Sequence, residues 1–370
     1  MIAPEVEIQV IASVVAVTCA IPGVFLVLRR MALMSDAISH SILLGIALGF
    51  LVAEDTSSPL LILAAAATGV VTVALVEVLN GTHLVKEDAA IGLVFPALFS
   101  IGVIIISRYA GDVHLDIDAV LLGELVFAPF DRLIIDGMDL GPRILWVMGT
   151  ILLLNVIFIV LFYKEIKLST FDAALAGALG FSPAVIHYLF MSLVSVTAVG
   201  AFDAVGSILV VALMIAPPAS AYLLTDRLPW MIALSAGLGV LGAWSGYWLS
   251  YALDVSVAGS MATMTGVIFG ITFLLAPQRG VVATARRRVR QKWEFAATML
   301  AIHLLNHEDS PDADEESRVA HLQKHLRWDP AFAEGVVRRA ERRGWVINPS
   351  NERLRLTDRG RSVARETTSA

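Results

Sequence analysis

The stretch GVFLVLRRMALMSDAISHSILLGIALGFLV, residues 23–52, decides the fold of this chain. It contains the end of one apolar block and most of the next, separated by Arg29 and Arg30. A helix of about 20 apolar residues crosses the hydrocarbon layer of a membrane, which offers no water to satisfy the backbone of an open structure. The stretch therefore predicts two membrane-spanning helices, over 8–28 and 36–53.

The same pattern recurs along most of the 370 residues. Hydrophobic residues make up 57% of the chain and charged residues 16%, and the mean hydropathy is +0.76. A soluble domain is usually about 25% charged, so the composition indicates a membrane protein. Further spans are predicted over 59–79, 89–107, 142–163, 184–203, 205–224, 230–252 and 259–276.

Two of the apolar pieces are irregular. The piece 119–128 is too short to cross, so we expect a partial or re-entrant element. Pro217 and Pro218 predict a break or kink in the block 205–224. We therefore expect an all-α polytopic membrane protein with eight or nine transmembrane helices.

The last quarter of the chain has a different composition. Residues 279–370 carry 18 Lys and Arg against 13 Asp and Glu, although the whole chain has a net charge of −6. Three segments with helical periodicity precede two short β-prone runs and a last helical piece, which is the order of a winged helix. The sequence thus predicts a transmembrane domain over 1–279 and a small winged-helix (α+β) domain over 280–370.

Basic residues in short loops predict the orientation, because such loops are usually cytoplasmic. If the spans alternate, the larger basic group falls on one side of the membrane. This group consists of Arg29, Arg30, Lys86, Lys164, Lys167, Arg227 and residues 286–288. We expect a multi-pass protein of the bacterial inner (plasma) membrane, with an extracytoplasmic loop 108–141 and a cytoplasmic C-terminal domain.

Asp36 and His40 are ionisable residues inside a predicted span, where such side chains are costly and usually functional. They are four residues apart and share one face of a helix. A carboxylate and an imidazole together suit Mn²⁺, Fe²⁺ or Zn²⁺. The alternative is that Asp36 caps the helix and His40 makes an interhelical hydrogen bond.

A second group of candidate ligands lies in 112–131. His114, Asp116 and Asp118 alternate, so an extended chain would place them on one side, and Glu124 lies within the short apolar piece. We favour metal-ligand roles for Asp118 and Glu124, with His114 as a weaker candidate, whereas a solvated loop accounts for Asp116. Asp203, between two predicted spans, is either a further ligand or a helix cap.

The loop KEIKLSTFDAALAGALGFSP, residues 164–183, has apolar and small residues at helical spacing and ends near Gly180. A short amphipathic helix in a cytoplasmic loop is suited to docking into the groove of a partner protein. The alternative is an interfacial helix that lies on the membrane. The dipeptide Gly-Lys does not occur, so the chain has no P-loop, and we expect a transport subunit and no enzyme.

The quoted stretch resembles the signature of the ABC-3 permease family, the membrane subunits of manganese, zinc and iron importers. Three later blocks also resemble that family and follow in its order: HLDIDAVLLGE (114–124), STFDAALAGALG (169–180) and DAVGSILVVALMIAPPASAYLLTDR (203–227). One departure is Leu44, where the family usually has proline. The resemblance covers about residues 8–276.

This resemblance implies an ATP-driven importer with several partners. These are a second permease subunit (an identical copy or a paralogue), cytoplasmic ABC ATPase subunits and an extracytoplasmic metal-binding protein. Asp36, His40, Asp118 and Glu124 then correspond to the family's intramembrane metal positions, forming a weak and transient site at the outer gate. Phe171, Asp172, Ala176 and Gly180 belong to the helix that couples to the ATPase. The transported Mn²⁺, Zn²⁺ or Fe²⁺ is cargo, and no permanently bound cofactor is expected.

Residues 330–364 resemble the winged helix of metal-responsive repressors of the diphtheria-toxin-repressor type. Its arginines would form a basic helix face, but we favour a regulatory role through protein or metal and do not expect nucleic acid as a partner. His303/His307 and His321/His325 are two i, i+4 pairs that could bind metal, although solvated histidines are the simpler interpretation. Two further functions stay open: a proton-coupled secondary metal transporter and a membrane-tethered metal-responsive regulator.

Overall fold

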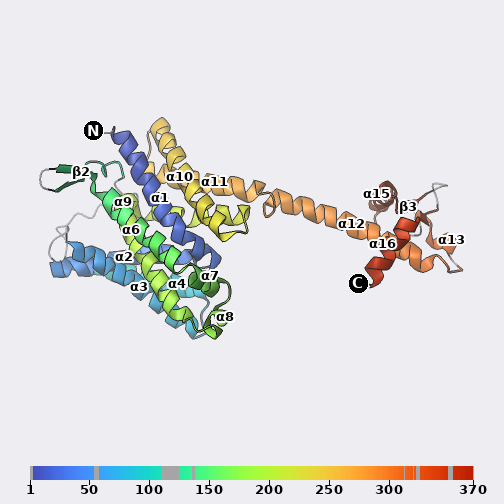
Figure 1. The fold of residues 1–370 in the computed structure, drawn as a ribbon, viewed down its shortest axis with the longest axis horizontal. Helices are drawn as coiled ribbons and strands as arrows, with labels where there is room; N and C mark the ends of the chain where they lie inside the picture. Colours follow the sequence, from blue (N-terminus) through green and yellow to red (C-terminus); the bar gives the residue numbers. More distant parts are fainter. Residues whose placement is uncertain are drawn as a thin grey trace. The chain divides into compact units, whose positions relative to one another are not determined.

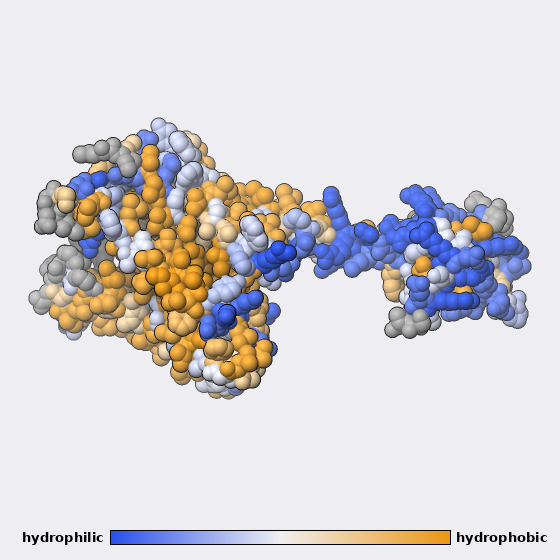
Figure 2. Space-filling view, viewed as in Figure 1, coloured by the Kyte–Doolittle hydropathy of each residue, from blue (hydrophilic) through white to orange (hydrophobic). Residues whose placement is uncertain are grey.

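The computed structural model describes residues 3–53, 58–109, 125–135, 138–311, 313–319, 321, 326–348 and 353–369. The chain forms two compact units, residues 1–280 and 281–370, each with its own hydrophobic core. Apolar side chains cover much of the visible face of the first unit, whereas hydrophilic residues dominate the visible face of the second (Figure 2).

The first unit is mostly helical, as predicted. In the part of the chain that the structure describes, eight helices are long and apolar enough to cross a membrane. They are α1 (Pro4–Leu28), α2 (Ala32–Ala53), α3 (Pro59–Gly81), α4 (Glu87–Tyr109), α6 (Arg143–Leu161), α9 (Pro183–Leu224), α10 (Leu228–Leu253) and α11 (Val257–Leu275) (Figure 1).

Helix α9 contains two of the predicted spans. The first arm places Phe190 beside Phe25, with ring centroids 5.9 Å apart, and the second arm places Met214 and Pro218 beside Gly23. Both arms therefore contact the same end of α1, so the chain reverses between them. The reversal lies at Gly206, where φ is 75°, a backbone conformation that favours glycine. Each arm is about 27 Å long or more at 1.5 Å per residue.

The position of this reversal corrects one prediction. Pro217 and Pro218 lie within the helical second arm, and the backbone leaves the helical conformation at Gly206 instead. Pro218 has no N–H, so the carbonyl of Met214 loses its usual i+4 donor. That carbonyl oxygen lies so close to the backbone of Gly23 that a Cβ atom there would overlap it. The prolines thus lie within the helix, at the place where the second arm packs closely against α1.

A second proline frees a carbonyl inside α1. Pro22 has no N–H to donate to Thr18, so the Thr18 carbonyl lacks its helical donor. Asn155 of α6 replaces it, because its Nδ2 donates to the Thr18 oxygen at 3.1 Å. Thr197 of α9 completes the cluster, with its Oγ1 3.2 Å from Asn155 Oδ1. Asn155, Thr18 and Thr197 are all fully buried, so this polar cluster joins three helices inside the apolar core.

One end of the bundle collects the end of α1, both ends of α9 and the end of α11. We call it the Arg29 end. His187, near the start of α9, contacts Arg29, and Arg279, which follows α11, donates to the Tyr222 carbonyl near the end of α9 at 2.9 Å. Helices α7 (Tyr163–Phe171) and α8 (Ala173–Ala178) follow α6 at this end (Figure 1).

A β-hairpin within the predicted loop 108–141 was not foreseen. It consists of β1 (Arg132–Ile135) and β2 (Met138–Pro142), paired antiparallel. Arg132 contacts Asp139 across the hairpin at 2.6 Å and Glu7 in the first turns of α1 at 3.3 Å. The Gly141 backbone N–H and the Arg132 guanidinium lower the pKa of Asp139. The hairpin is thus tied to the N-terminal end of α1.

The second unit is a small α+β fold. Its helices are α12 (Val281–His307), α13 (Ala313–Glu316), α15 (Pro330–Arg342) and α16 (Asp358–Ser369), and β3 (Val346–Ile347) pairs antiparallel with β4 (Arg355–Leu356). Apolar residues of α12, α15 and the hairpin form its core. Arg361 of α16 contacts Glu308 at 2.6 Å and thereby lowers the pKa of that carboxyl.

We predict that Asn155→Leu destabilises the protein, because the Thr18 carbonyl would lose its donor inside the membrane. The expected coupling is about 1 kcal/mol, the order measured for hydrogen bonds between transmembrane helices. The measurement is a double-mutant cycle with Pro22→Ala, followed by unfolding in detergent. Alanine at position 22 restores the backbone donor, so Asn155→Leu should cost less in that background. An equal cost in both backgrounds would contradict this role of Asn155.

Candidate functional site

Asp36 and His40 lie on one face of α2, as their spacing predicts. His40 Nε2 is 3.4 Å from Asp36 Oδ1, and the two side chains are 32% and 37% exposed, respectively. Both are therefore half-buried and remain accessible from outside the single chain. The pair provides one nitrogen and one carboxylate donor at a separation that a single metal ion can bridge.

Two aromatic residues of α4 hold the His40 ring. The Phe95 ring stacks on it at a centroid distance of 5.7 Å, and Phe99 meets it edge-on at 6.2 Å. These contacts restrict the orientation of the imidazole and place apolar surface beside the donor pair. Sequence reasoning missed both residues; the only available signal was an i, i+4 aromatic pair in an apolar block.

Within the described residues, Asp36 and His40 alone do not complete a metal site. Among the described residues, no third His, Cys, Asp or Glu joins Asp36 and His40 in a group with metal-ligand spacing. A transition-metal ion needs about four ligands or more, so further donors must come from elsewhere. Candidates within this chain, His114, Asp118 and Glu124, lie outside the described residues.

Asp203 lies in the first arm of α9, three residues before the reversal at Gly206. The Asp203 side chain is exposed. It lies 20 residues along the first arm from Pro183, the start of α9 at the Arg29 end. Its role as ligand or cap stays a prediction.

Helix α8 ends before Gly180, as its sequence predicts, and it also has an N-terminal cap that was not foreseen. At its start, Asp172 Oδ1 accepts a hydrogen bond from the Leu175 N–H at 2.9 Å. At its end, Gly180 has a φ of 87°, and the Phe181 N–H donates to the Ala176 carbonyl at 3.1 Å. This helix of six residues is therefore defined at both ends by local chemistry.

Three exposed apolar side chains lie on and beside α8, although the coupling segment is two helices and not one, since the backbone leaves the helical conformation at Asp172. Phe171, the last residue of α7, is 62% exposed, Leu175 of α8 46% and Leu179, at the end of α8, 61%, whereas Ala176 is buried. We call Phe171, Leu175 and Leu179 the α8 stripe. An exposed apolar stripe on a capped helix is suited to docking against another protein.

Arg29 connects α7 to the helical bundle. Its Nε donates to Thr170 Oγ1 at 3.0 Å and its Nη2 to Ser169 Oγ at 3.0 Å, just before the α8 stripe. The guanidinium also lies over the Phe190 ring at 5.0 Å. One side chain from the end of α1 thus contacts both the segment before α8 and the first arm of α9. Sequence reasoning used Arg29 for orientation alone.

His187 and Glu77 extend this network to α3. His187 Nε2 is 2.6 Å from Glu77 Oε1, and its Nδ1 is 3.2 Å from Arg29 Nη1. Glu77 pairs with His187 because the first arm of α9 begins at the level where α3 ends. No sequence spacing relates residues so far apart.

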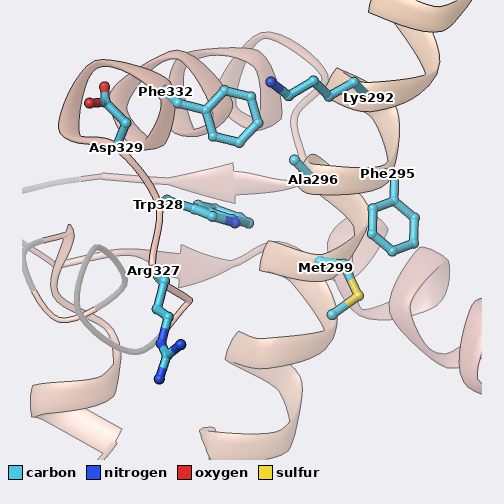
Figure 3. A pocket seen from close by; sticks show the side chains of 8 residues that line it. All are labelled: Lys292, Phe295, Ala296, Met299, Arg327, Trp328, Asp329 and Phe332. Carbon is cyan, nitrogen blue, oxygen red and sulfur yellow. The ribbon is translucent and has the colours of Figure 1, made fainter.

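The second unit contains a shallow pocket of about 480 Å³ beside α12 and α15. Trp328 and Phe332 form one side of it, and Lys292 Nζ lies 4.7 Å from the Phe332 ring centroid (Figure 3). Among the described residues that line the pocket, the one carboxylate is Asp329, which caps α15 by accepting from the Ala331 N–H at 3.0 Å. The lining residues therefore provide no pair of groups for acid–base chemistry.

Comparison with known proteins adds a family to this geometry. A family model described as the ABC 3 transport family matches residues 6–276. The zinc transport system membrane protein TroD of Treponema pallidum is 47% identical over 358 residues, which are 97% of each chain. The manganese transport system membrane protein MntD of Bacillus subtilis is 46% identical and covers 76% of this chain and 95% of its own.

A solved structure also resembles the chain. PsaBC from Streptococcus pneumoniae, in complex with Fab, shares 29% identity at a TM-score of 0.62 and covers 74% of this chain and 92% of the matched chain. The alignment with TroD includes 97% of this chain, so TroD has a counterpart of most of the second unit. The match to MntD covers nearly all of that relative and leaves about a quarter of this chain unaligned.

Proposed function

This chain belongs to the ABC 3 transport family, and on that premise we propose that it is the membrane permease subunit of an ATP-driven importer. Its cargo would be a divalent transition-metal ion: Mn²⁺, Zn²⁺ or Fe²⁺. The observation that carries the proposal is the half-exposed pair Asp36–His40 inside a membrane span. The names of TroD and MntD, which refer to zinc and manganese transport, agree with this donor chemistry.

A second permease subunit fits the incomplete donor set. Asp36 and His40 supply two donors, and a second copy or a paralogue with an equivalent pair would raise the number to four. Such a site binds weakly until both subunits approach, which favours release of the ion after transport. The donor types do not select among the three metals.

The Arg29 end is the cytoplasmic end in this proposal, since it carries most of the basic loop residues. Asp36 then lies in the inner half of α2, about 6 Å along the axis from its first residue. This placement differs from the expected outer gate: the pair lies further along the path, toward the cytoplasm. An extracytoplasmic binding protein would deliver the ion at the opposite end, where α1 begins.

The α8 stripe would dock into a groove of a separate ABC ATPase subunit. Movement of α8 would reach the bundle through Ser169, Thr170 and Arg29, whose hydrogen bonds are about 3.0 Å long. Arg29 also contacts the first arm of α9, so docking and the transport path share one mechanical link. This chain then contributes transport and no hydrolysis of its own.

The second unit fits a cytoplasmic winged helix of regulatory function. Its helices, hairpin and last helix follow that order, and α15 carries Arg338, Arg339 and Arg342. Arg343 is paired with Glu294 at 2.8 Å and lies over the Trp345 ring, which leaves less basic surface for DNA. Nucleic acid is therefore not part of the proposal.

Uptake of ⁵⁴Mn²⁺ and ⁶⁵Zn²⁺ into vesicles tests the function. When the vesicles contain the ATPase subunit and ATP on the side of the Arg29 end, uptake should be rapid. It should stop when either the ATPase subunit or ATP is omitted. A proton-coupled transporter would instead continue without ATP and would respond to a pH gradient. Uptake that persists without ATP would therefore overturn the importer proposal.

We predict that Asp36→Ala and His40→Ala each lower metal uptake about 10-fold or more. Loss of an outer-sphere partner already costs a metal site 10–100-fold, and these residues are placed as direct ligands. The matched controls are Asp88→Ala and His83→Ala, which change exposed residues of the same types near the Arg29 end. Equal uptake by the Asp36 and His40 variants and the controls would remove the pair from the transport path.

We predict that Phe171→Ala and Gly180→Val lower the number of ions transported per ATP hydrolysed. The first removes the largest side chain of the α8 stripe, and the second forces a β-branched residue into a φ of 87°. The measurement is uptake and phosphate release in the same vesicles. Phe130→Ala is the control, since Phe130 is 69% exposed and lies outside α7 and α8. An unchanged ratio would return α8 to the role of an interfacial helix.

A further inference from the structure

Three potential metal ligands meet in the second unit: His303 and His307 of α12, and Glu316 at the end of α13. One ligand atom from each lies within 4.8 Å of the other two. His321 adds a third imidazole, with its Nε2 3.0 Å from Glu316 Oε2. We propose that His303, His307, Glu316 and His321 form a binding site for a divalent transition-metal ion, best suited to Zn²⁺.

The distances are close to those that a tetrahedral ion requires. Zinc binds imidazole nitrogen and carboxylate oxygen at about 2.0–2.1 Å, so neighbouring ligand atoms in a tetrahedron lie about 3.3 Å apart. Glu316 Oε2 is 3.3 Å from His303 Nε2 and 3.0 Å from His321 Nε2. The rings of His303 and His307, one helical turn apart, have centroids 4.7 Å apart. His303, His307 and Glu316 lie close enough for one ion to bridge them, and His321, in contact with Glu316, would turn toward the same ion as the fourth donor.

The side chains of this cluster are largely buried, unlike acidic and histidine side chains that are solvated at a protein surface. His303 is 8% exposed and packs among core residues of α12, and the Glu316 side chain is 14% exposed. The His321 side chain is 24% exposed, which leaves a path for the ion to enter. The Glu316 carboxylate contacts both His303 and His321, and a divalent ion at this point would bind all three side chains in place of these contacts.

The donor set distinguishes this site from the pair in the membrane. Three imidazoles and one carboxylate favour Zn²⁺ over Mn²⁺, which prefers oxygen ligands. An ion here would join α12 to the segment 313–321, which the chain connects through residues 308–312. Metal binding would therefore stabilise the second unit. This inference goes beyond the proposed transport function and does not depend on it, because all four residues lie in the second unit.

The test uses the full chain in detergent, with Asp36→Ala and His40→Ala present to remove the pair in the membrane. Equilibrium dialysis against Zn²⁺ alone, followed by metal analysis, should give one tightly bound ion per chain. His307→Ala combined with His321→Ala should abolish that binding, and Glu316→Gln should weaken it at least 10-fold, in line with the loss of a direct ligand. Glu315→Gln, one residue from Glu316, is the control and should retain the ion.

The same samples give a second measurement. Zn²⁺ should raise the unfolding temperature of the parent chain and of Glu315→Gln, and it should leave that of the double histidine variant unchanged. Circular dichroism without metal shows whether each variant is folded. If the double histidine variant does not fold, the zinc binding of Glu316→Gln is compared with that of the parent instead. Equal zinc binding by Glu316→Gln, Glu315→Gln and the parent would overturn the site, whatever the result of the uptake experiments.

Discussion

The first unit depends on how its helices satisfy carbonyl groups that proline leaves without a donor. Inside a membrane no water can replace the lost bond, so another part of the protein must approach. The Thr18 carbonyl, freed by Pro22, accepts from Asn155, and the Met214 carbonyl, freed by Pro218, lies against Gly23. Both contacts involve α1, which they join to α6 and to the second arm of α9. Both freed carbonyls therefore lie at contacts between α1 and a neighbouring helix.

The same helix ends at Arg29, which links the packed helices to the segment before α8. A guanidinium has five donors in a rigid fork and can serve several partners at once. Arg29 uses them on Thr170, Ser169 and His187, and its plane lies over Phe190. Because His187 also meets Glu77, three helices and the segment before α8 share one polar network. Displacement of α8 would disturb this network before it reached the apolar core.

Features that depend on local sequence could be predicted, and features that depend on tertiary contact could not. Apolar blocks of sufficient length gave the spans, and the spacing of Asp36 and His40 gave their shared face. Gly180 indicated the end of α8. In contrast, Pro217 and Pro218 indicated a break that the structure places at Gly206, where φ is 75°. The pair of His187 with Glu77 and the rings of Phe95 and Phe99 around His40 join residues that no periodicity relates.

The two candidate metal sites use the same donor types, and their surroundings would give them different affinities. The pair in α2 offers two donors on a half-exposed face, so an ion there keeps other ligands and leaves readily. A transport site needs this weakness, since an ion that binds too tightly is not released. The proposed cluster in the second unit brings together three donors, one of them on a nearly buried histidine, with His321 beside them as a fourth. Donor number and burial, more than donor identity, therefore separate a site that passes an ion from one that retains it.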